Sequence, residues 1–170
     1  KSCLHWCCRN GHIEVLDYLV SRLYQPEALH LLGTGDGTTP VHIACFGGHV
    51  HLLKHVYSSY YSSYSTSADD EGGTVQHFGR SDFHHTNNWG CLPEHFACMS
   101  ARACPALFDF LLETVHGGDH SVTARYFFSY KNSEGMTPVH KWLLYMSKDG
   151  REVEESLQWL AALRLHLPAD

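Results

Sequence analysis

Histidine and cysteine are the residue types here that could do chemistry, because the 170 residues include 15 histidines and seven cysteines. Their densest cluster consists of His84, His85, Cys91, His95 and Cys98. Imidazole and thiolate groups are the ligands that tetrahedral zinc takes in proteins, so this stretch is a candidate zinc site. Against it, the sequence holds no Cys-x-x-Cys pair of the kind found in zinc knuckles.

A cysteine nucleophile is the second chemistry to consider. Cys91 lies four residues before His95, and Cys104 lies beside Pro105. Nucleophilic catalysis needs a stabilised thiolate and a base that a third group holds in place, and neither spacing supplies these. The sequence also has no glycine-rich phosphate loop. We therefore expect that the protein is not an enzyme and has no catalytic residue, metal or cofactor.

The same residue types recur at matching positions of four similar segments, residues 2–8, 39–45, 92–98 and 137–143. One column of this alignment holds His5, His42, His95 and His140, and another holds Cys8, Cys45 and Cys98. A glycine precedes the proline by three residues in the last three segments, at Gly37, Gly90 and Gly135. A repeated position indicates a repeated structural role, so these columns count against zinc and against a nucleophile.

Each segment carries the signals of a helix-turn-helix unit. Thr39 and Thr137 are good helix N-caps, and the proline after each fits the first helical position, where its missing N–H costs nothing. Gly11 and Gly48 supply the left-handed turn that ends the helix. A second, amphipathic helix follows, with a predicted buried stripe of Val15, Leu16 and Leu19 or of Leu52, Leu53 and Val56.

This order of signals resembles the ankyrin repeat, most fully at residues 39–56. The resemblance implies an all-α solenoid of helix-turn-helix units with β-turn or hairpin fingers. It also implies that the column histidine is structural, with its ring nitrogens bonding the Thr hydroxyl and neighbouring backbone. The column cysteine would then be a small apolar filler.

Three residues depart from the family pattern. Leu92 replaces the capping Thr, Glu94 replaces an apolar core residue, and Trp142 stands where a small residue belongs. Such departures from a local rule tend to mark function or strain. Glu94 is expected either to turn out of the core or to pair with a neighbouring histidine.

The resemblance gives a map of one array over residues 1–170. Its repeats cover about 1–31, 34–57, 87–117 and 132–167, separated by an insertion at 58–86 and a long finger at 117–133. The second helix of the fourth repeat is expected at about 151–166. The Ser/Tyr-rich stretch 57–67 is either a surface loop or a contact or phosphorylation segment. The chain opens without Met, which indicates a fragment of a larger protein.

Composition limits the classes of partner. A net charge of −6 argues against nucleic-acid binding, which needs a basic surface. No apolar run approaches the roughly 20 residues of a membrane span. An odd number of cysteines without a disulfide framework fits reduced thiols, so we expect an intracellular, cytoplasmic protein.

The family resemblance implies that helices and fingers form a concave groove that binds another protein or peptide. The groove positions carried over by column are Arg9, Asn10, Asp36, Thr38, Phe46, Asn88, Trp89, Cys91, Met99, Ser100, Glu134, Met136, Leu144 and Tyr145. Trp89, Phe46 and Met136 are the expected apolar anchors, because aromatic and Met residues are enriched at interface hot spots.

The excess of histidine and cysteine leaves a second function open. The chain could be a metal- or pH-responsive regulatory module, because imidazole titrates near neutral pH. His49, His51 and His55 illustrate the choice: they form either a solvated helix face or a pH-responsive surface.

Overall fold

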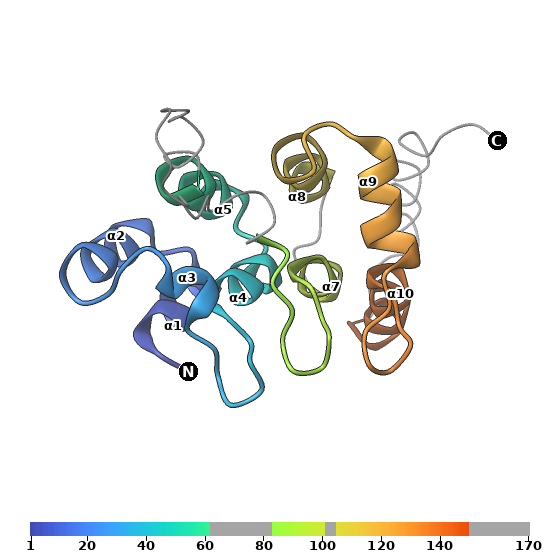
Figure 1. Ribbon diagram of the computed structural model, residues 1–170, viewed down its shortest axis with the longest axis horizontal. Coiled ribbons are helices and arrows are strands. Elements are labelled where there is room, and N and C mark those ends of the chain that lie inside the picture. Colours follow the sequence, from blue (N-terminus) through green and yellow to red (C-terminus); the bar gives the residue numbers. More distant parts are fainter. Residues whose placement is uncertain (62–82, 101–104, 150–170) are drawn as a thin grey trace, which may run out of the picture.

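Pairs of helices joined by short turns follow one another along the chain. The computed structural model describes residues 1–61, 83–100 and 105–149, and this described part is all-helical, without a β-strand. The first helices of the four units are α1 (Cys3–Asn10), α4 (Pro40–Gly47), α7 (Pro93–Met99) and α10 (Pro138–Asp149). They pack in that order, α1 on α4, α4 on α7 and α7 on α10, as one row (Figure 1). The predicted all-α repeat architecture is confirmed.

The second helices form another row above the first (Figure 1). They are α2 (Ile13–Arg22), α5 (Val50–Val56) with the π-helical turn η1 (Tyr57–Tyr61), and α8 (Pro105–Asp109) with the π-helical segment η3 (Phe110–Val115). Leu16, Leu52, Leu53 and Leu111 of this row are buried. Gly11 and Gly48, with φ values of 77° and 66°, make the left-handed turns between the rows, as predicted.

Val15 is a correction to the predicted buried stripe. Its side chain is 48% exposed, whereas Leu52, in the same column of the next repeat, is buried. The physical reason lies in the stacking. Figure 1 shows α5 between α2 and α8, while α2 stands at the end of the row.

The stretch 117–133, where a long finger was expected, contains a helix. It consists of α9 (His120–Ala124) and the π-helical segment η4 (Arg125–Ser129), and Asp119 caps it by accepting hydrogen bonds from the N–H groups of Ser121 and Val122 at 2.9 and 3.2 Å. This helix packs on η3 through α9 and on α7 and α10 through η4, and in Figure 1 it stands across the end of the second row. Phe127 is fully buried there, which explains why the segment is helical.

Other expectations fall partly or wholly outside the described residues. The Ser/Tyr-rich insertion is described only up to residue 61, where η1 continues α5 and the Tyr60 hydroxyl donates a 2.6 Å hydrogen bond to Asp17. The helix expected at 151–166 lies outside the described part. A short helix, α3 (Ala28–Leu31), packs against α4 and was not predicted. Every described helix is too short or too polar to cross a membrane.

Glu94 is turned into the core. Its side chain has no exposed surface, and its Oε1 lies 2.8 Å from Nδ1 of His84 and 3.0 Å from Nε2 of His116. Burial acts to raise the pKa of Glu94, but the interactions with His116 and His84 outweigh it and hold the pKa below its usual range. Of the two expectations for Glu94, pairing with histidine is therefore confirmed.

Candidate partner-binding groove

Three fingers of equal construction precede α4, α7 and α10. In each, a residue's N–H donates to the carbonyl four residues later: Thr34 to Thr38, Asn87 to Cys91 and Asn132 to Met136, at 2.9, 3.1 and 2.9 Å. A glycine with φ between 67° and 76° closes each turn, which explains why Gly37, Gly90 and Gly135 recur in the sequence. The fingers are therefore hydrogen-bonded turns of fixed shape.

Side chains fix the same turns from inside. The Asn87 Oδ1 accepts hydrogen bonds from the N–H groups of Trp89 and Cys91 at 3.0 and 2.9 Å. Asn132 does the same for Glu134 and Met136 at 3.1 and 2.9 Å. Each finger consequently presents the residue at its tip in a set direction.

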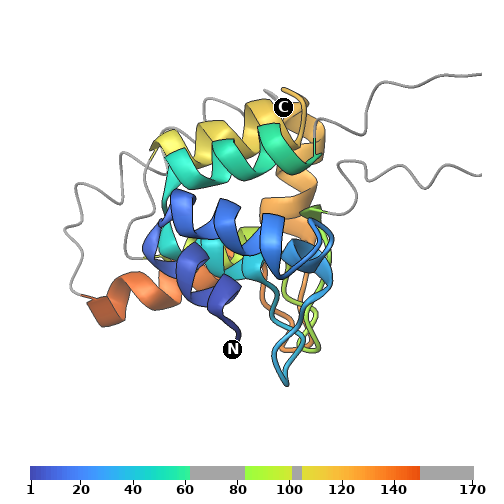
Figure 2. The same cartoon turned by 90° about the vertical axis from the view of Figure 1, so that its left-hand side faces the viewer.

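Backbone hydrogen bonds also join one finger to the next. The Asn88 N–H donates to the Asp36 carbonyl, and the Ser133 N–H donates to the Trp89 carbonyl, both at 2.9 Å. Figure 2 shows the fingers projecting side by side beyond the helices. They form a continuous edge along one side of the stack.

The histidine column holds each finger against the helix of the preceding repeat. Nδ1 of His42 accepts from the Thr39 N–H at 3.2 Å and lies 2.8 Å from its hydroxyl, while Nε2–H donates to the Cys91 carbonyl at 3.0 Å. His5 bonds the Thr38 carbonyl at 3.0 Å, and His95 bonds the Met136 carbonyl at 3.1 Å. The structural role predicted for this column is confirmed.

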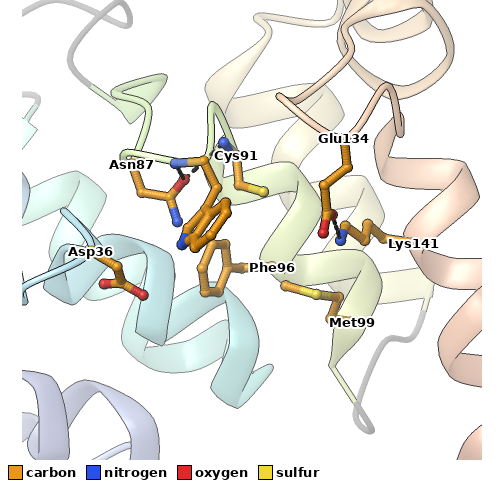
Figure 3. A pocket seen from close by; sticks show the side chains of 8 residues that line it. Asp36, Asn87, Cys91, Phe96, Met99, Glu134 and Lys141 are labelled. Atoms are coloured by element: carbon orange, nitrogen blue, oxygen red, sulfur yellow. Dashed lines mark hydrogen bonds and ion pairs between the residues drawn. The ribbon is translucent and has the colours of Figure 1, made fainter.

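Between the second and third of these fingers and α7 the surface is hollowed. The hollow has a volume of about 220 Å³ (Figure 3) and is lined by Asp36, Asn87, Trp89, Cys91, Phe96, Met99, Glu134 and Lys141. Trp89 is 56% exposed at its edge. Figure 3 shows Phe96 between Asp36 on one side and Met99 on the other.

The charges lie at the rim of the hollow. Lys141 of α10 forms an ion pair with Glu134, and the hydrogen bond from Lys141 lowers the pKa of the Glu134 carboxyl (Figure 3). On the opposite side, hydrogen bonds from the Thr34 hydroxyl and the Thr38 N–H lower the pKa of Asp36. Both carboxylates are therefore ionised at neutral pH.

Five of the fourteen predicted groove residues line this hollow: Asp36, Trp89, Cys91, Met99 and Glu134. Others lie elsewhere. Arg9 is placed over the ring of Phe46, 4.9 Å from its centroid, and the Asn88 amide donates to the Gly35 carbonyl at 3.4 Å. The remaining positions outside the hollow are Asn10, Thr38, Ser100, Met136, Leu144 and Tyr145.

Thr38 and Ser100 differ from the groove expectation, because their side chains are buried. The Thr38 hydroxyl accepts from the Asn87 amide at 3.3 Å, so it supports the neighbouring finger. Column transfer placed these two residues in the groove because it carries over position and not side-chain direction.

Sequence reasoning missed Asn87, Phe96 and Lys141. Phe96 and Lys141 occupy one column, directly after the column histidine, which also contains Trp6 and Ile43. That column was available in the alignment and points toward the fingers. Asn87 had a signal too, because Asn132 stands at the same distance before the next glycine.

The five-residue zinc cluster does not assemble. His95 uses its ring nitrogens on the Leu92 N–H and the Met136 carbonyl, and Cys98 is buried among core residues. Burial raises the pKa of the Cys91 thiol, which holds it protonated, the opposite of what a nucleophile needs.

The pairing of helices in two rows, with hydrogen-bonded fingers along one edge, defines a helical-repeat solenoid. Residues 4–54 match the family model described as ankyrin repeats (many copies), so this part of the chain consists of ankyrin repeats. No curated protein matches it in sequence.

Among solved structures, the chain is similar to Yar1 in the crystal structure of the yeast ribosomal protein Rps3 in complex with its chaperone Yar1. The TM-score is 0.60 with 16% identity, over 86% of this chain and 84% of that chain. This likeness is one of fold.

Proposed function

We propose that the chain is a protein-recognition module that binds a segment of a partner protein along the fingers, with one apolar side chain seated in the hollow beside Trp89. The observation that carries the proposal is the hollow itself, where the side chains of Trp89, Phe96 and Met99 meet on a surface that the backbone holds rigid. Aromatic and Met side chains in such concave sites contribute much of the binding energy at protein interfaces. The similar protein Yar1 was solved in complex with the ribosomal protein Rps3 as its chaperone, which supports a protein partner.

The rim indicates what flanks the apolar anchor. Asp36 and Glu134 are exposed carboxylates on opposite sides of the hollow, while the one lysine of the lining is held by Glu134. The chain also has a net charge of −6. The proposed ligand is therefore an apolar residue with Lys or Arg nearby, because opposite charges at a rim speed association and select partners.

An intracellular setting belongs to the same proposal. The six described cysteines are thiols, and burial raises the pKa of Cys7, Cys8 and Cys45. Reduced thiols of this kind suit a reducing compartment.

The test uses affinity capture with the full chain, followed by titration calorimetry of the captured partner. We expect Trp89→Ala to weaken binding at least about 10-fold, which corresponds to about 1.4 kcal/mol, the scale of a hot-spot residue. Tyr18→Ala is the matched control, because Tyr18 is an aromatic residue on α2 that is 62% exposed but lies away from the fingers. Binding that depends on Tyr18 and is indifferent to Trp89 would overturn the proposal.

A further inference from the structure

Three side chains from separate parts of the chain converge in the core beneath α7. His84 follows the insertion, Glu94 lies on α7, and His116 ends η3. One ligand atom from each lies within 4.8 Å of the others. The side chains of Glu94 and His116 are fully buried, and that of His84 is 9% exposed.

Aromatic rings close the site on one side. The His84 ring stacks on Tyr126 at 4.1 Å between centroids with an interplanar angle of 4°, and His116 stacks on the same tyrosine at 5.3 Å. Tyr126 belongs to η4, part of the helix that interrupts the regular repeat. The inserted helix therefore completes the surroundings of the three side chains.

The hydrogen bonds of His116 decide which of its nitrogens carries hydrogen. The Thr123 hydroxyl donates to the Asp119 carbonyl at 3.0 Å, so its oxygen accepts from Nδ1–H of His116 at 2.8 Å. In the neutral ring Nε2 then presents a lone pair toward Glu94, 3.0 Å away. A lone pair facing a carboxylate needs a positive charge between them, which either a proton on Nε2 or a metal ion supplies.

This arrangement is the reverse of that in the histidine column. There Nδ1 accepts from backbone N–H groups and Nε2–H donates to a carbonyl, as His42 does. Metal-bound histidines instead donate their second N–H to a neighbouring oxygen, which orients the lone pair toward the ion. His116 has this metal-ligand pattern, with Nδ1–H donating to an oxygen, whereas His42 does not.

Two atoms of the cluster lack a hydrogen-bond partner within the described residues, Nδ1 of His84 and Oε2 of Glu94. The His84 nitrogen lies 2.8 Å from Oε1 of Glu94, but the direction is wrong for an N–H hydrogen bond. Buried polar atoms without partners destabilise a fold, because they lose their hydrogen bonds to water and gain none in the protein. A cation bound among the three side chains would give the His84 nitrogen a partner and would neutralise the Glu94 carboxylate.

We propose that His84, Glu94 and His116 form a binding site for a divalent transition metal of the zinc class. Two imidazoles and one carboxylate are a known zinc ligand set, with metal–ligand distances of about 2.0–2.2 Å and a fourth position for water. Tetrahedral bonds of that length separate ligand atoms by about 3.4 Å. The present spacings of 2.8 and 3.0 Å from Oε1 of Glu94 to His84 and His116 would therefore have to widen by roughly half an ångström. Thr123 positions His116 through its ring Nδ1–H.

The experiment titrates the purified full chain, stripped of metal by a chelator, with Zn²⁺ by calorimetry and with Co²⁺ by visible absorption. We expect one equivalent of Zn²⁺ and a tetrahedral Co²⁺ spectrum in the unmodified chain. Glu94→Gln should abolish both. Thr123→Val, which keeps the side-chain shape but removes the acceptor for His116, should weaken binding about 10- to 100-fold.

Asp17→Asn is the matched control. Asp17 pairs with His55 at 2.8 Å on the surface of the same protein, without a third ligand, so this variant should bind as the unmodified chain does. Circular dichroism checks the fold of each variant, and His84→Gln, at the more accessible edge, replaces Glu94→Gln if that variant does not fold. An unmodified chain that binds no Zn²⁺, or equal binding by Thr123→Val, Glu94→Gln and Asp17→Asn, would overturn the proposal.

Discussion

At the scale of single residues, the histidine column joins each repeat to the next. We expect His42→Ala to lower the free energy of unfolding by about 1–3 kcal/mol, because it leaves the buried Thr39 N–H without its acceptor and removes one of the two hydrogen bonds to the Cys91 carbonyl. His51→Ala should have little effect, since His51 is exposed and its contact with the Gly11 carbonyl is long, at 3.4 Å. Urea denaturation of both variants measures the difference, and equal midpoints would contradict the assignment.

The same histidine gives the fold a pH dependence. Burial lowers the pKa of His42 from 6.5 to about 4, and it lowers those of His5 and His95 too. Between pH 6.5 and about 4 the unfolded chain therefore binds protons that the folded chain does not, so stability is complete above this window and falls as the pH falls through it. For His42 the loss amounts to about 3 kcal/mol.

Urea denaturation at a series of pH values measures this loss. His42→Gln should show a smaller decline across the window, although its stability at neutral pH is lower. Asp17 and Asp36, whose pKa values are lowered, act below this range and do not obscure it. A free energy of unfolding that stays constant from pH 6.5 to about 4 would rule the mechanism out.

The sequence predicted the column residues but not the partners of Glu94. The roles of His42 and Cys45 followed from their repetition and from the resemblance to the ankyrin repeat, because repeated positions carry repeated contacts. His84 and His116 lie 10 and 22 residues from Glu94 along the chain, and what brings them together is the stacking of separate elements. The spacing of these residues along the sequence does not predict that they lie close together in the fold.

At the scale of elements, the close approach of α1 and α4 depends on Gly47. A Cβ at this position would lie 2.7 Å from the Arg9 carbonyl oxygen and 3.2 Å from that of Cys8. We expect Gly47→Ala to destabilise the protein by about 1–3 kcal/mol, because the two backbones must separate. The gain in helix propensity, at most about 1 kcal/mol, does not offset this.

Gly35→Ala is the control for this substitution. Nothing lies within 4 Å of a Cβ at Gly35, so the change should stay within about 0.5 kcal/mol. Thermal unfolding measures the stability of both variants. If Gly47→Ala is as stable as Gly35→Ala, α1 and α4 can accommodate a methyl group at position 47 and the prediction is wrong.

The elements that the sequence failed to predict share a cause. The start of α10 was clear from Thr137-Pro138, but residues 117–133 carry no repeat signature, so the helix from His120 to Ser129 was taken for a finger. Its capping residue, Asp119, was visible in the sequence. Its buried face could not be recognised in the sequence. That face packs against η3 and α7, and its apolar residues follow no periodic pattern.

At the scale of the whole molecule, the main contacts between first helices join neighbours in the row: α1 with α4, α4 with α7, and α7 with α10. Figure 1 shows α1, α4, α7 and α10 in sequence, without contact between the ends. Stability in such an array is the sum of repeats and of interfaces between neighbours. Within this chain α4 is held on two sides and α1 on one, so local opening should reach α1 first.

The cysteine column allows the order in which the repeats open to be measured. Cys8, Cys45 and Cys98 place a buried thiol at the same position of three successive repeats, and burial raises the pKa of Cys8 to about 12 and that of Cys45 well above its usual value. Such thiols react with an alkylating reagent only when their own repeat opens, whereas Cys3 is exposed and reacts at once. Mass spectrometry of peptides alkylated in mild denaturant should therefore show Cys8 labelled before Cys45, and labelling at equal rates would mean that the stack opens as one unit. The labelling rate of each column cysteine thus reports how fast its own repeat opens, and no added probe is needed.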